Sequence, residues 1–195
     1  TGAGATATST ELQRLVETTR IPVFTVDSAR GMVPDEHEYC AGLGYLPLNK
    51  AAQRIDEADV VLLLGQRLDY TWGFGGSPPF SNGVKHIFVD PSAAEVGRSR
   101  AVTLPILGDI GPVVTQLADV AAGRSWSGGN WAKSLKVTKD EYREKLAELA
   151  SGENPMHPMD ASLALQKFVD DDTCMVFDGG DYCHFFRASF ESQRP

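Results

Sequence analysis

Two glycine-rich turns are the segments of this sequence best suited to hold an anion. Residues 2–5 (GAGA) precede a helical pattern, and residues 178–181 (DGGD) follow an apolar run. Backbone N–H groups exposed at such turns bind phosphate where a helix begins. The first turn is either a phosphate cradle or a tight strand-to-helix turn without ligand. The second carries two carboxylates, which repel an anion unless a cation intervenes, so by itself it is a turn.

Three charged side chains come directly after predicted strands. Arg67 is suited to pair with a pyrophosphate through two hydrogen bonds, or it forms a surface ion pair with Asp69. Asp90 is suited to accept hydrogen bonds from ribose hydroxyls, or it caps the turn at Pro91. Asp109 either faces a nucleotide base or caps the helix that follows. Each of the three therefore has a ligand-binding and a structural interpretation.

The residue pattern gives little support to other chemistry. The histidines and cysteines stand at His37, His86, His157, His184, Cys40, Cys174 and Cys183, without ligand spacing or a CxxC pair. We therefore predict no metal site in this chain and no disulfide framework, and we expect reduced thiols in a cytoplasmic protein. No GxSxG or other nucleophile signature is present.

An alternation of strands and helices must position these residues. Apolar, β-forming runs predict strands at 21–26, 59–65, 85–90, 102–107 and 173–178. Helical patterns are found at 10–20, 49–57, 111–122, 131–150, 159–169 and after 181, with a helical turn near 93–96 and long loops at 27–48 and 69–83. This alternation predicts an α/β fold with a doubly wound, mainly parallel, Rossmann-like sheet.

Ligands of such sheets bind at the carboxyl ends of the strands. The candidate nucleotide-binding residues are therefore those that follow strands, together with the first turn: Gly2, Gly4, Gly65, Arg67, Asp90, Gly108 and Asp109.

Length and composition restrict the classes of protein to which this chain can belong. The chain has 195 residues, a net charge of −8, 42% hydrophobic and 23% charged residues, which is typical of a globular protein. The acidic balance argues against a nucleic-acid partner. No run of about 18 apolar residues is present, so we expect no membrane span, and no signal-peptide pattern opens the chain. The abrupt first and last residues lead us to expect a fragment of a larger protein.

Composition also divides the chain. We predict a first domain at 1–123, a linker and a charged amphipathic helix at 124–154, and the incomplete beginning of a second α/β domain at 155–195.

Taken together, these pieces resemble the thiamine-diphosphate-dependent enzymes of the acetolactate synthase-like superfamily. The resemblance covers nearly the whole chain through the order and spacing of several motifs. They are GAGA at 2–5, IPV at 21–23, the glycines up to GLG at 42–44, ADV at 58–60, GQRLD at 65–69, IFVDP at 87–91, EVG at 95–97 and GD at 108–109.

The resemblance implies a fold and a set of cofactors. Residues 1–123 would be the central domain, which binds FAD, ADP or nothing, and its sheet would have a central strand before Thr1. Residues 155–195 would open the diphosphate-binding domain, with Gly179, Gly180 and Asp181 close to thiamine diphosphate. The parent would be a magnesium-dependent decarboxylase or carboligase (a lyase or transferase) acting on 2-keto acids. It would assemble as a homo-oligomer.

The same resemblance implies that this chain is inactive alone. The glutamate that activates the cofactor and the GDG…N motif that holds magnesium are not found in it, so we expect no catalytic residue here. The alternatives are a stand-alone nucleotide-binding module, such as a sirtuin-like deacylase or an electron-transfer subunit, and a scaffold without ligand. The lack of a cysteine pair at zinc spacing argues against a deacylase, and the second α/β unit argues against a simple electron-transfer subunit.

Overall fold

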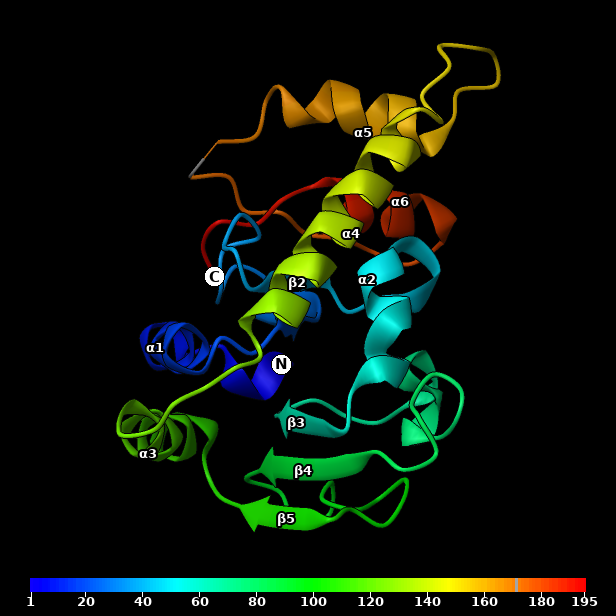
Figure 1. The fold of residues 1–195 in the computed structure, drawn as a ribbon. Coiled ribbons are helices and arrows are strands. Elements are labelled where there is room, and N and C mark those ends of the chain that lie inside the picture. The colour runs from blue at the N-terminus through cyan, green and yellow to red at the C-terminus, as the bar shows by residue number, and fades with distance from the viewer. Residues whose placement is uncertain (171) are drawn as a thin grey trace.

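Parallel strands alternate with helices along the chain (Figure 1), and the computed structural model describes residues 1–170 and 172–195. In chain order the helices and strands are α1 (Ser9–Thr19), β1 (Val23–Thr25), β2 (Cys40–Leu43), α2 (Lys50–Gln53), β3 (Val60–Leu64), β4 (Lys85–Asp90), β5 (Leu104–Leu107), α3 (Ile110–Ala122), α4 (Gly129–Ala147), α5 (Pro158–Gln166) and α6 (Asp181–Ser189). Short 3-10 turns lie at η1 (Ala3–Ala5), η2 (Asp27–Ala29), η3 (Leu46–Leu48), η4 (Arg54–Glu57) and η5 (Tyr70–Gly75).

All strand pairs in the described part of the chain are parallel, which confirms the predicted doubly wound α/β class. The strands form two sheets, β1-β2 and β3-β4-β5, rather than one. In the larger sheet Leu62 is opposite Ile87, and Ile87 is opposite Leu104.

An open position separates the two sheets. The amino group of Thr1 donates to Phe24 O at 2.7 Å, and Val26 N donates to Thr1 O at 3.0 Å. On the other side, Gly2 N donates to Leu64 O at 3.1 Å. These bonds have the parallel pattern, so the first two residues bridge β1 and β3 at the carboxyl ends of both strands.

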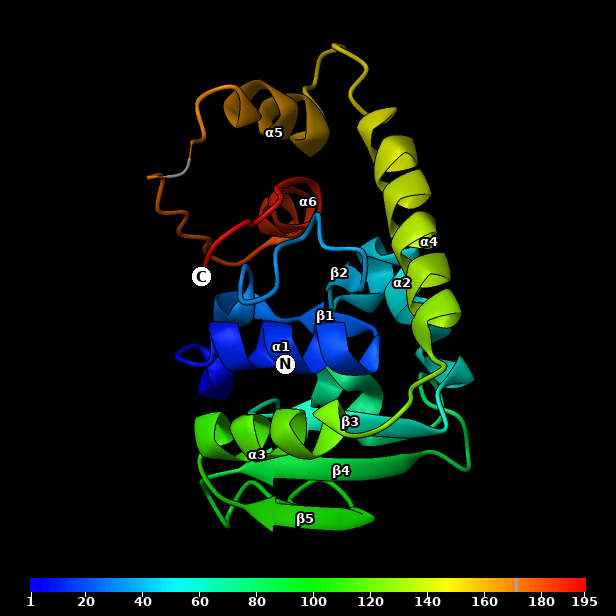
Figure 2. The same ribbon diagram turned by 60° about the vertical axis from the view of Figure 1, so that its left-hand side comes forward.

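The apolar strands are buried because both faces of β3 and β4 are covered. On one face Leu64 and Val89 join a core with α1 and α3, which lie side by side (Figure 2). On the other face Leu63 and Phe88 pack with residues of η4, of η5 and of the loops on either side of η5: Ile55, Leu68, Trp72 and Phe80. Two-sided burial explains the continuous apolar run of β3.

The structure corrects two predicted elements. The segment predicted as a strand at 173–178 has no regular structure in its described residues, and Val176 is 88% exposed, because no neighbouring strand satisfies its backbone groups. The predicted loop 27–48 contains β2. The expected helical turn at 93–96 is present as a single turn, in which Val96 N donates to Ser92 O at 3.3 Å.

Helix α4 and the tail (residues 155–195, through α6) pack on the first domain. Helix α4 contacts β2 and α2, and α6 contacts η3, α4 and α5. In Figure 2 the tail lies above the β1-β2 sheet. No helix in the described ranges is long and apolar enough to cross a membrane.

Candidate functional site

The first glycine turn and the turn after β3 meet backbone to backbone. Gly65 has a φ of +58°, and a Cβ built on it would lie 2.7 Å from the Cα of Gly4. Gly2 is buried, while Gly4 is exposed at the apex of η1. The structure therefore brings Gly2, Gly4 and Gly65 together as predicted from their positions at strand ends. The two backbones can approach this closely because glycine has no Cβ atom.

Arg67 forms an ion pair, but not with the predicted partner. Its Nε lies 3.2 Å from Oε2 of Glu95, and its side chain is 67% exposed. Arg98 contacts the other oxygen of Glu95 at 3.1 Å. Asp69 instead accepts hydrogen bonds from Thr71 N at 2.9 Å and Thr71 Oγ1 at 2.5 Å, because it caps η5. The expected pairing with Asp69 is therefore wrong.

A cavity of about 270 Å³ lies beside this ion-pair network. The residues that line it include Arg67, Arg98 and Arg100, together with Phe74 and Phe88. Arg100 also donates to Gly75 O. Three arginines against the two carboxylates of Glu95 and Asp69 leave a small local positive charge in a chain whose net charge is −8, which favours an anion.

Sequence reasoning missed Arg98 and Arg100. The only signal is the basic GRSR run at 97–100, which follows the turn after β4 and looks like an ordinary solvated loop. Only the fold shows that this loop closes back onto Arg67.

The two aspartates at strand ends differ in their structural roles. Asp90 is 9% exposed, and its Oδ1 accepts a hydrogen bond from Ser92 N at 2.8 Å, so the predicted cap is present. Asp90 O also accepts from Gly108 N at 3.1 Å, which ties the ends of β4 and β5 together. Asp109 stands at the N-cap position of α3, is exposed, and makes no side-chain cap bond. Its carboxylate is the one that remains available to a ligand.

The second glycine turn lies at the exposed start of α6. Gly180 has a φ of +98° and is the N-cap of α6, without a side-chain cap bond, and Gly179 N donates to Asp178 Oδ1 at 2.7 Å. Gly179, Gly180 and Asp181 are all exposed. Among the described residues no group of three or more histidine, cysteine or acidic side chains could hold a metal ion.

Contacts of Tyr45 place this turn near the end of β2. The Tyr45 ring stacks on His184 with centroids 4.7 Å apart. Burial raises the pKa of the Tyr45 hydroxyl, and the neighbouring Asp181 carboxylate raises it further. The tail therefore approaches the first domain on the side where its strands end.

This geometry defines a class: a Rossmann-like α/β domain with its candidate anion-binding residues at the carboxyl ends of parallel strands. Residues 1–117 match the family described as "Thiamine pyrophosphate enzyme, central domain". The chain belongs to this family, and the resemblance read from the sequence is confirmed.

Relatives extend over the rest of the chain. It is 27% identical to human 2-hydroxyacyl-CoA lyase 1, with 100% of this chain and 33% of the relative aligned. It is 30% identical to a probable acetolactate synthase of Mycobacterium bovis, over 94% of this chain and 32% of the relative. With 2-hydroxyacyl-CoA lyase of Arabidopsis thaliana the identity is 32%, over 74% of this chain and 25% of the relative. The chain spans about a third of the length of the first two relatives.

Proposed function

We propose that this chain is the central portion of a thiamine-diphosphate- and magnesium-dependent enzyme of the lyase and acetolactate synthase type. The observation that carries the proposal is the family match over residues 1–117, supported by the relatives that align along the tail. Residues 1–123 would be the central domain, 124–154 a linker with the amphipathic helix, and 155–195 the start of the diphosphate-binding domain.

The tail turn fits a diphosphate only together with a cation. The exposed N–H groups at the start of α6 suit phosphate oxygens, whereas the carboxylates of Asp178 and Asp181 repel them. Magnesium would remove that repulsion. When bound, thiamine diphosphate supplies the electron sink for decarboxylation of the substrate. Gly179, Gly180 and Asp181 would then orient the diphosphate.

We further propose that the chain alone does not catalyse the reaction or bind thiamine diphosphate with magnesium, because most ligands of the cofactor would come from other domains. Titration calorimetry with thiamine diphosphate and magnesium should show no heat of binding. Micromolar binding by this chain would overturn the proposal of inactivity while leaving the family unchanged.

The central domain would itself bind a nucleotide by contacting the diphosphate group of that nucleotide. The cavity beside Arg67, Arg98 and Arg100 supplies positive charge for phosphates, and the unpaired carboxylate of Asp109 suits a ribose hydroxyl or a base. FAD, ADP and coenzyme A all carry this diphosphate. A ligand-free scaffold remains the second candidate, because Glu95 already neutralises part of the arginine cluster.

A thermal-shift screen with FAD, ADP, NAD and coenzyme A tests the nucleotide proposal. A ligand at a hundred times its Kd adds about 2.7 kcal/mol, which raises the Tm by roughly 5–10 °C in a chain of this size. Arg67→Ala and Asp109→Asn should remove the shift. Arg14→Ala, which breaks an exposed ion pair with Asp119 on α3, should keep it. No shift with any of the four nucleotides would favour the scaffold.

We propose that the partners are the remaining domains of the parent chain and further copies of the protein, in the cytoplasm. Several large apolar side chains are exposed and would be covered by such partners: Leu104, Leu107, Phe168, Val176 and Tyr182. Sedimentation of the chain at high concentration should show self-association. A monomer at every concentration would contradict it.

A further inference from the structure

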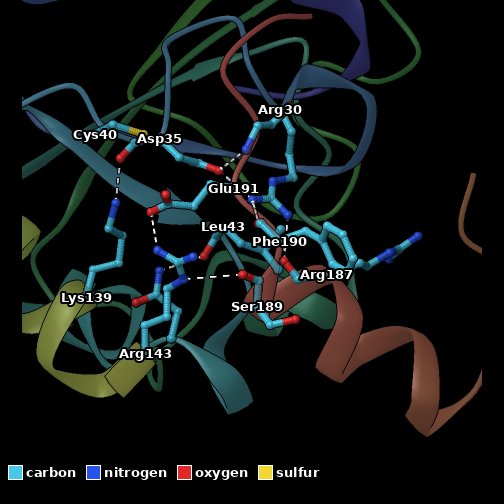
Figure 3. Close-up of polar contacts among 12 residues, drawn as sticks. Arg30, Asp35, Cys40, Leu43, Lys139, Arg143, Arg187, Ser189, Phe190 and Glu191 are labelled. Atoms are coloured by element: carbon cyan, nitrogen blue, oxygen red, sulfur yellow. Dashed lines mark hydrogen bonds and ion pairs between the residues drawn. The ribbon is translucent and has the colours of Figure 1, made fainter. Parts of the chain in front are cut away.

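The carboxyl end of α6 is held by side chains from three separate elements, and Figure 3 shows those of α4 and of the loop between β1 and β2. Arg143 of α4 donates to Ser189 O at 3.3 Å and pairs with Glu191. Gln166 of α5 donates to the same carbonyl at 3.0 Å. The third contribution comes from the loop between β1 and β2 in the first domain. Cationic and amide donors at this end satisfy carbonyls that a helix otherwise leaves unpaired.

Arg30 is the loop residue that reaches this helix end. Its Nη1 donates to Arg187 O at 2.5 Å, and its Nη2 donates to Phe190 O at 2.6 Å. The same Nη2 lies 2.5 Å from Asp35 Oδ2. The Arg30 side chain is 13% exposed, so one largely buried guanidinium joins the loop to two carbonyls of the tail.

Asp35 completes the attachment with both its backbone and its side chain. Ser192 N donates to Asp35 Oδ2 at 2.8 Å, and Asp35 N donates to Ser192 O at 3.0 Å. Lys139 of α4 donates to Asp35 O at 2.6 Å. Asp35 is 2% exposed. We call Arg30 and Asp35, with the bonds they make to residues 187–192, the clasp.

The other end of α6 has no comparable attachment. Its N-cap is Gly180 without a side-chain cap bond, and residues 178–182 are exposed. Helix α6 also contacts the first domain at η3, through the stack of His184 on Tyr45, and through an ion pair between Arg187 and Asp27 at 3.1 Å. The helix is therefore anchored at its carboxyl end, and its glycine turn extends from that anchor.

We propose that Arg30 and Asp35 are positioning residues, which fix α6 against the first domain and thereby set the place of the glycine turn at 178–181. The functional meaning of that place rests on the proposed function, in which the turn orients a diphosphate. A single rigid helix of nine residues transmits the position of the clasp to the turn.

The cysteines provide a built-in test. Cys183 is 8% exposed in the first turns of α6, whereas Cys174 is exposed in the segment before it. A thiol-specific reagent, iodoacetamide, followed by mass spectrometry of the two peptides gives both labelling rates in one sample. In Arg30→Met the Cys183 rate should rise by at least about tenfold, because charge-assisted hydrogen bonds hold the helix closed. The Cys174 rate should stay unchanged.

A second variant and a matched control separate positioning from general loss of stability. Asp35→Asn should also raise the Cys183 rate, since it removes the charge that orients Arg30. Arg54→Met is the control, because Arg54 bonds to Ser134 and Thr138 of α4 and to Glu57 but not to α6. It should leave Cys183 protected. Hydrogen exchange at β4 should be the same in all variants.

The labelling and exchange results test only the positioning role of the clasp. A Cys183 rate that is unchanged in both clasp variants overturns the proposal, and so does a rise accompanied by equally faster exchange at β4. Neither result depends on a nucleotide or on thiamine diphosphate, so this experiment does not test the proposed function.

Discussion

Gly65 lies where the carboxyl end of β3 touches the first glycine turn. Its φ of +58° belongs to the left-handed region, and its Cα hydrogen faces Gly4 at a distance that a methyl group cannot share. This contact fixes the two turns that frame the candidate site relative to each other. The close approach to Gly4 therefore gives Gly65 a structural role.

Gly65→Ala should destabilise the chain by about 2–4 kcal/mol, from the left-handed backbone and the clash with Gly4. Urea unfolding followed by circular dichroism measures the change. Gly83→Ala is the matched control, since nothing lies within 4 Å of a Cβ there, and it should be neutral or slightly stabilising. Equal midpoints for the two variants would contradict the role of Gly65.

His86 gives a prediction about pH. It is 2% exposed on β4, and its Nε2 has no hydrogen-bond partner among the described residues. Burial, with the nearby Arg100, lowers its pKa below the ordinary 6.5. The unfolded chain therefore binds a proton more readily than the native one. Above pH 6.5 His86 should leave the free energy of unfolding unchanged. As the pH falls from 6.5 through the lowered native pKa, the free energy of unfolding should decrease.

His86→Phe should reduce that decrease by at most about 1.4 kcal/mol per pH unit, the slope for one proton. The difference between the two unfolding curves isolates His86, because all other groups are common to both chains. An identical pH dependence in the variant would show that His86 does not titrate with folding.

Sequence reasoning located the site residues that follow strands but not their partners. Gly65, Asp90 and Asp109 lie at strand ends because the strands themselves are strongly apolar runs. The partner of Arg67 could not be found in the same way, since Glu95 lies beyond the next strand. Such a pair depends on how a loop folds back, which no local pattern encodes.

At the scale of elements, burial decides which predictions hold. Runs 59–65 and 85–90 are strands because helices and loops cover both of their faces. The equally apolar run 173–178 has no strand beside it and stays irregular. In contrast, β2 (CAGL) lacks β-forming residues, yet all four are buried beside β1. Tertiary context overrides propensity in both cases.

We predict that a strand added at the open position between β1 and β3 would stabilise the chain. An extension of about five β-forming residues before Thr1 should pair with both edges in parallel. It would give the order β2, β1, added strand, β3, β4, β5, which is the dinucleotide-binding order. The extension also converts the amino group of Thr1, whose pKa burial lowers to about 5, into an uncharged amide.

We expect the Tm to rise by several degrees, at roughly 2–4 °C for each kcal/mol gained. A glycine, serine and proline extension of the same length is the control, because it also replaces the amino group of Thr1 by an amide but does not form a strand. Scanning calorimetry of both chains gives the comparison. If the two extensions raise the Tm equally, the position does not accept a strand.

At the scale of the whole molecule, helix α4 packs on the core of the first domain although it lies beyond the proposed boundary at residue 123. Leu135 of α4 is fully buried against Ala41 and Ala51, and Trp131 Nε1 donates to Glu57 Oε2 at 2.6 Å. Lys139 satisfies Asp35 O from the same helix. Helix α4 therefore closes the core over β2 and α2, although a linker-like segment precedes it and the family match stops at residue 117.

Shortening the chain should show this dependence as an ordered loss of stability. Residues 1–123 should be less stable than 1–195 by more than about 3 kcal/mol, because Leu135 leaves the core and buried polar groups lose their partners. Residues 1–150 should fall between the two, since they keep α4 but lack the tail contacts of Arg30 and Asp35. Urea midpoints of the three chains check the order. An equal midpoint for 1–123 and 1–195 would place the domain boundary at residue 123 after all, with α4 acting only as a connector.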